Sequence, residues 1–76
     1  MSFFQKKYDS WVEEFGPQYP MSIDAGLDLC EALRSSHRTI EAERLLANII
    51  VMCRRVHGID HDSTQIALSL QERVKE

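Results

Sequence analysis

The sequence predicts an all-α fold, an antiparallel stack of helical hairpins with four helices, in a single domain covering residues 1–76. Apolar residues recur at three- and four-residue steps in four successive segments, which is the period of an amphipathic helix. The chain has three glycines and two prolines, too few for the many turns of a β-rich fold. Its 43% hydrophobic and 28% charged residues are typical of a globular protein.

The first predicted helix covers residues 3–15 and is rich in aromatic side chains. Gly16 and Pro17 end it, because glycine permits positive φ and proline cannot continue the hydrogen-bond ladder, and Pro20 adds a second stop. The aromatic residues are either ordinary core, packed on the second and third helices, or an exposed edge that docks another protein. The apolar positions of this helix are Phe3, Phe4, Tyr8, Trp11, Val12 and Phe15.

The second predicted helix covers residues 22–35 and begins at Ser22, a residue type that favours the cap position. Gly26 lies in its middle and weakens the helix by about 1 kcal/mol relative to alanine. Such a glycine either marks a close approach of a neighbouring helix or is simply tolerated. The apolar stripe of this segment consists of Ile23, Leu27, Cys30 and Leu33.

The third and fourth predicted helices cover residues 39–57 and 63–75. Gly58 directly follows the third helix, as expected for a residue that terminates a helix in a left-handed conformation. Asp62 with Gln65 three residues later resembles a capping box at the start of the fourth helix. The third helix has the clearest apolar face, formed by Ala42, Leu45, Leu46, Ile49, Ile50, Cys53 and Val56.

An internal repeat relates the two halves of the chain. Gly16 and Gly58 are 42 residues apart, and at this offset the first helix overlays on the third with apolar character preserved. Such a period is typical of stacked helical hairpins, in which each hairpin buries its apolar face against the next. The alternative is a closed four-helix bundle acting as a small structural subunit or a homodimer.

Two segments resemble a known family. The residues R-T-I-E-A-E-R-L-L from Arg38 to Leu46 resemble the start of a tetratricopeptide B helix, and R-R-V-H-G-I-D-H-D-S-T from Arg54 to Thr64 is similar to the helix join of the kinesin light chain-type repeat. The resemblance implies a B helix, a complete A–B pair and an A helix. His37 occupies the position where the family usually has glycine.

The resemblance implies a protein-interaction or scaffold module, a subunit or fragment of a larger assembly. Its A helices would line a concave surface, where acidic side chains favour a protein or peptide partner with Lys or Arg. Aromatic residues of the first helix are a second candidate contact, and a solenoid end without a polar cap favours homo-oligomers. The predicted partner-binding residues are Asp24, Asp28, Glu31, Gln65, Ser69, Phe4, Tyr8 and Trp11.

Other classes of function lack support in the sequence. No glycine-rich phosphate loop, nucleophile elbow or HExxH motif is present, so we expect no enzyme and no cofactor. Acidic and basic residues are evenly spread, with a net charge of -3, which argues against a nucleic-acid partner. The longest apolar run, residues 49–53, is far shorter than the roughly twenty residues of a membrane span.

The cysteines and histidines bear on two questions, a metal site and the redox environment of the protein. Cys53, His57 and His61 follow one another at four-residue steps, but a structural zinc site needs four ligands. We therefore expect no metal. Cys30 and Cys53 fall on apolar helix faces and are predicted to be reduced core thiols, which places the protein in the cytoplasm or another reducing compartment. No secretory signal is recognisable.

Overall fold

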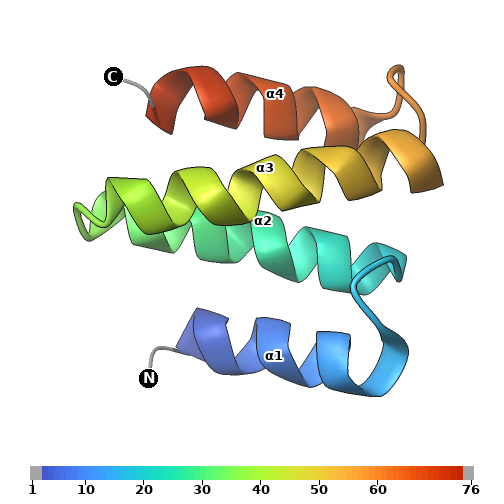
Figure 1. The fold of residues 1–76 in the computed structure, drawn as a ribbon, viewed down its shortest axis with the longest axis horizontal. Helices are drawn as coiled ribbons and strands as arrows, with labels where there is room; N and C mark the ends of the chain where they lie inside the picture. Colours follow the sequence, from blue (N-terminus) through green and yellow to red (C-terminus); the bar gives the residue numbers. More distant parts are fainter. Residues whose placement is uncertain (1–2, 75–76) are drawn as a thin grey trace.

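The computed structural model describes residues 3–74, which form four helices and no strand (Figure 1). The prediction of an all-α class is confirmed. The predicted first and third helices end within one residue of the observed bounds, and the last residue of the predicted fourth helix lies outside the described residues. The helices are α1 Phe3–Phe15, α2 Pro20–Ser35, α3 Thr39–Val56 and α4 Asp62–Val74.

Helix α2 is the centre of the arrangement. It packs against α1, α3 and, less extensively, α4, while α4 packs mainly against α3. Figure 1 shows α1 and α4 at opposite edges, and within residues 3–74 the backbone of α1 approaches neither α3 nor α4. The four helices therefore follow one another in space in chain order, with an additional contact between α2 and α4.

At Gly26, side chains from α1 and α3 approach the backbone of α2. A Cβ atom at this position would lie 3.0 Å from Tyr8 Cε1 of α1, and nearer still to the Cδ1 atom of Ile49 on α3. Real Cβ atoms essentially never make a contact as short as the one to Ile49, and the contact to Tyr8 is tighter than most. Of the two interpretations of this glycine, close helix approach is therefore the one that the packing supports.

The core is built from α2, α3 and α4. Cys30 and Cys53 are both fully buried and not disulfide-bonded, in agreement with the predicted core thiols. The aromatic residues of α1 divide between the two alternatives, because Tyr8 packs against the core and Trp11 is half-buried, whereas the three phenylalanines are exposed. The buried apolar residues are Ile23, Ala25, Leu27, Leu29, Cys30, Leu33, Ala42, Leu46, Ile49, Ile50, Cys53, Ala67, Leu70 and Val74.

Helix α2 begins two residues earlier than predicted. Pro20 is its first residue and not a stop, because the fixed φ of proline suits the first turn, where its missing N–H would have no partner. Tyr19 is the cap residue and makes no side-chain capping bond. Ser22 is therefore not the cap. It lies inside the helix, fully buried, and its hydroxyl has no hydrogen-bond partner.

The start of α4 also differs from the predicted capping box. Asp62 is the first helical residue, and the ring atom Nδ1 of His61 accepts a hydrogen bond of 3.1 Å from the backbone N–H of Ser63. The amide of Gln65 donates to the carbonyl of Ile59 at 2.7 Å. An imidazole thus takes the capping role that the sequence assigned to a carboxylate.

Left-handed residues terminate the helices, as the sequence predicts. Gly58 has φ 85° and follows the end of α3, where its N–H donates to the carbonyl of Cys53. His37 has φ 62°, the only positive φ of a non-glycine residue within residues 3–74. The position at which the tetratricopeptide family usually has glycine therefore has a left-handed backbone here.

The burial pattern repeats at 41 residues and not at the predicted 42. Gly16 and Gly58 are 42 residues apart, but the first buried residue that matches between the helices comes seven residues after Gly16 and six after Gly58. An alignment on the loop glycines therefore misplaces the helices by one position. On α2 the matching buried residues are Ile23, Gly26, Leu29 and Leu33, and on α4 they are Thr64, Ala67, Leu70 and Val74.

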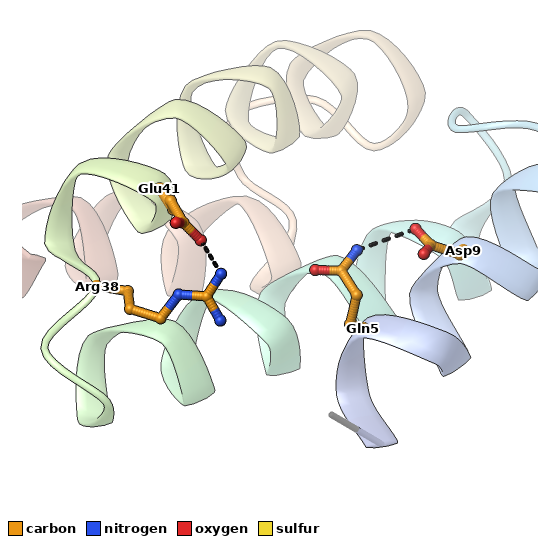
Figure 2. A network of polar contacts seen from close by, with 4 residues as sticks. All are labelled: Gln5, Asp9, Arg38 and Glu41. Atoms are coloured by element: carbon orange, nitrogen blue, oxygen red, sulfur yellow. Dashed lines mark hydrogen bonds and ion pairs between the residues drawn. The ribbon is translucent and has the colours of Figure 1, made fainter. Parts of the chain in front are cut away.

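Two exposed polar contacts lie within single turns of the chain (Figure 2). The amide of Gln5 donates to Asp9 on α1 at 3.0 Å, and Arg38 forms an ion pair with Glu41 at the start of α3. Exposed pairs of this kind stabilise a fold by less than about 1 kcal/mol each. The arrangement of the helices therefore depends on the apolar core and not on these contacts.

Candidate partner-binding groove

Helix α2 exposes only one line of side chains. Its residues at the other positions are buried or half-buried against α1, α3 and α4. The exposed positions follow one another at three- and four-residue steps, so they form a single stripe along the helix. The exposed residues from Met21 onward are Met21, Asp24, Asp28, Glu31 and Ser35, and three of them are acidic.

A hollow lies on each side of this stripe. The first lies between α1 and α2, and Phe4, Asp28 and Glu31 are among the residues that line it. The second lies between α2 and α4, where Glu31 faces Gln65 and Ser69. Glu31 borders both hollows. We call the stripe and these two hollows the α2 groove, with α1 and α4 as its walls.

The site residues predicted from the sequence divide into five that line the two hollows and three, Asp24, Tyr8 and Trp11, that do not. Phe4, Asp28, Glu31, Gln65 and Ser69 line the hollows of the groove. Their assembly from three helices agrees with the expectation that the second and fourth helices present polar residues to a common surface.

Asp24 lies on the same stripe, outside the two hollows. Its Oδ1 atom accepts a hydrogen bond of 3.4 Å from the hydroxyl of Ser63 at the start of α4. This contact ties the first turns of α2 and α4 together. Asp24 therefore contributes both negative charge to the surface and a link between the two helices that form it.

Tyr8 and Trp11 are positioned mainly by packing. Tyr8 is half-buried, and its ring lies beside the backbone of Gly26. Burial is the main cause that raises the pKa of its phenol. Trp11 is also half-buried and stacks on Tyr19, with ring centroids 6.0 Å apart, while Tyr19 stacks on Phe15 at 4.7 Å. These three rings form an aromatic cluster where α1 leads into α2, and Phe15 and Tyr19 leave much of their surface exposed.

The charges of the groove are not uniform. Glu31 forms an ion pair of 3.5 Å with Arg34, whereas Asp28 has no ion pair within residues 3–74. Arg73 lines the hollow on the α4 side. The groove therefore offers its least compensated negative charge at Asp28, on the side of α1, and at Asp24 beyond the hollows, and it has a basic side chain at the α4 wall.

Arg73 and Ile66 are among the groove residues that the sequence analysis missed. Arg73 follows Gln65 and Ser69 at four-residue steps, so helical periodicity could have placed it on the same face. Ile66 also lines the hollow and is 56% exposed. Periodicity gives no such signal for Ile66, because its position resembles that of a core residue until the neighbouring helices are known.

The residues considered for metal binding have other contacts. The rings of His57 and His61 stack with centroids 3.9 Å apart, and His61 also caps α4. Cys53 is fully buried, and desolvation raises the pKa of its thiol. No group of three or more His, Cys, Asp or Glu residues within 3–74 is arranged to hold a metal ion.

Comparison of the chain with protein-family models, with curated proteins and with solved structures found no match. The resemblance to the tetratricopeptide family therefore stays a prediction from the two motifs. Within the described part of the chain, none of the helices combines the length and the apolar character that crossing a bilayer requires. The groove is accordingly the feature from which a function can be argued.

Proposed function

We propose that this chain is a protein-interaction module that binds a protein or peptide partner in the α2 groove. The observation that carries the proposal is the single exposed stripe of α2, where Asp28 and Glu31 border the two hollows and Asp24 continues the same acidic line. A helix buried on its remaining sides holds these carboxylates in fixed positions, which lowers the entropy lost on binding.

The groove favours a partner segment with both basic and apolar side chains. Lys or Arg would pair with Asp28 and Asp24, which are the least compensated acidic groups. Apolar side chains would contact Phe4, 39% exposed on the α1 wall, and Ile66 on the α4 wall. A segment that combines the two kinds of contact would be bound along the length of α2.

The predicted relation to tetratricopeptide repeats belongs to the same proposal. It is supported by the packing of the helices in chain order and by the left-handed backbone at His37 and Gly58. In that interpretation α2 and α4 are A helices, and the α2 groove is part of a concave face.

Affinity capture with matched baits tests the proposal. The wild-type chain, an Asp28→Arg variant and a Lys6→Glu variant are immobilised, and bound proteins from the native source are quantified by mass spectrometry. Lys6 is exposed on α1 and lines neither hollow of the groove, so it serves as the control. We expect partners that Lys6→Glu retains and Asp28→Arg loses at least about tenfold, as for a charge pair at an interface. If the two variants retain the same proteins, the groove is not the binding site.

A further inference from the structure

The outer face of α3 carries a second exposed stripe, which is basic and apolar. Its members follow one another at four- and three-residue steps, so they form one line along the helix. Ile40 is 67% exposed and Val51 is 45% exposed, so the line carries aliphatic surface as well as charge. We call this line the α3 ridge, and it consists of Ile40, Arg44, Ala47, Val51 and Arg54.

The arginines of the ridge are unpaired. Within residues 3–74 neither Arg44 nor Arg54 forms an ion pair or a hydrogen bond through its side chain. Of the acidic residues on the helix, Glu41 is paired with Arg38, and Glu43 is exposed beside the ridge with no ion pair within residues 3–74, so the ridge sets two arginines against one carboxylate. The ridge therefore presents positive charge beside apolar surface, which is the combination that the α2 groove favours in a partner.

The ridge and the groove lie on opposite sides of the molecule. Helices α2 and α3 pack against each other through their buried faces, and each stripe is on the side of its helix away from that contact. A ridge cannot reach the groove of its own chain, whereas it can reach the groove of another copy. The helices also match in length, with 18 residues in α3 and 16 in α2.

We propose that the occupant of the α2 groove is the α3 ridge of a second copy of this chain. The inference rests on the proposed function, since it names the partner of the same groove. Arg44 and Arg54 of one copy, about 15 Å apart along α3, pair with the acidic line of the next copy, which runs about 10 Å from Asp24 to Glu31, and Val51 lies against the apolar groove walls. Because donor and acceptor surfaces differ, the contact is head-to-tail and leaves a free ridge and a free groove at the ends, so the assembly grows as an open chain.

The contact is expected to be weak and sensitive to salt. One helix in one groove buries an area at the lower end of specific interfaces, about 1,200 Å² in total. Its charge pairs lie at the rim of the contact, where they are screened within about 10 Å at 0.1 M salt. Self-association should therefore rise with protein concentration and fall as sodium chloride is added.

Sedimentation velocity of the full 76-residue chain, under reducing conditions and from micromolar to millimolar concentration, tests the inference. The wild type is expected to form a growing series of oligomers at low salt. A ridge variant, Arg44→Ala with Arg54→Ala, and a groove variant, Asp28→Arg, are each expected to weaken association at least about tenfold. Lys6→Ala with Lys7→Ala removes two exposed positive charges from α1 and should associate like the wild type.

Mixing the ridge variant with the groove variant gives the decisive result. In this mixture the groove variant supplies an intact ridge and the ridge variant supplies an intact groove. We therefore expect a discrete 1:1 dimer that grows no further. Circular dichroism of each variant alone verifies that its helices are intact. A wild type that stays monomeric, a closed dimer that stops growing, or a mixture that stays monomeric would overturn the inference. If groove-dependent partners are still captured in that case, the proposed function stands without self-association.

Discussion

The replacement of Gly26 by alanine tests the packing on which the whole arrangement of helices depends. Alanine in place of glycine within a helix gains about 1 kcal/mol in helix propensity. The added methyl group would meet Ile49 Cδ1 and Tyr8 Cε1, the latter at 3.0 Å, and overpacking of a core costs about 1–3 kcal/mol. The free energy of unfolding should therefore fall by about 0–2 kcal/mol, although the substitution favours the helix in isolation.

A second substitution separates the clash from other effects. Ile49→Val removes the Cδ1 atom that lies closest to the added methyl group, and alone it should cost about 0.5–1.5 kcal/mol. In the double variant the alanine methyl fills part of the space that Cδ1 leaves. The double variant should therefore be more stable than the sum of the single effects predicts, by about 1 kcal/mol or more.

Urea unfolding followed by far-UV circular dichroism measures all four members of this cycle. Gly58→Ala is the matched control, because Gly58 has φ 85° and nothing within 4 Å of its added Cβ. Its cost comes from backbone strain, so it should be additive with Ile49→Val. If Gly26→Ala and Ile49→Val are additive within about 0.5 kcal/mol, the close approach of the three helices at Gly26 is refuted.

Three further predictions concern buried and capping groups. Ser22→Ala removes a buried hydroxyl that has no hydrogen-bond partner within residues 3–74, so it should leave the free energy of unfolding unchanged or raise it by up to about 1 kcal/mol. Thr64→Val removes the 2.7 Å hydrogen bond to the carbonyl of Gly58 and should lower the free energy of unfolding by about 1–3 kcal/mol. Equal losses of stability in urea unfolding would contradict this contrast. Burial raises the pKa of the Cys30 thiol to about 12, so above about pH 9 the folded state retains a proton that the unfolded state releases. The free energy of unfolding should therefore fall as pH rises above about 9. If a Cys30→Ala variant loses stability with pH at the same rate as the wild type, Cys30 is not the cause of this loss. His61→Ala should cost about 1 kcal/mol and speed amide exchange in the first turn of α4, while unchanged exchange there would rule out the imidazole cap.

Periodicity in the sequence was sufficient for the helices and for part of the groove. The three- and four-residue spacing placed Asp28 and Glu31 on an exposed face and Cys30 and Cys53 in the core, while the exposed Ser69 was selected from the family resemblance. These outcomes depend on which side of a helix faces its neighbours, which is a local property of the sequence.

The errors arose where local preference and packing compete. Pro20 is a helix breaker in general but suits the first turn, so the start of α2 was placed two residues late. The repeat was aligned on Gly16 and Gly58, but the connections place these glycines differently relative to the helices, which gave an offset one residue too long. Gly26 indicated a possible close helix approach, but the sequence did not identify Tyr8 and Ile49 as the side chains that meet there, because this depends on the distance between helices.

The burial of α2 separates the residues that determine the fold from those that would determine binding. Three helices contact α2, and small buried residues such as Ala25 and Gly26 allow this close packing. A substitution on that side changes a core contact and should cost stability. Asp28 is exposed and carries no ion pair within residues 3–74, so its replacement leaves the packing intact. A loss of binding or of self-association in Asp28→Arg, at unchanged unfolding free energy, is therefore attributable to the groove surface itself.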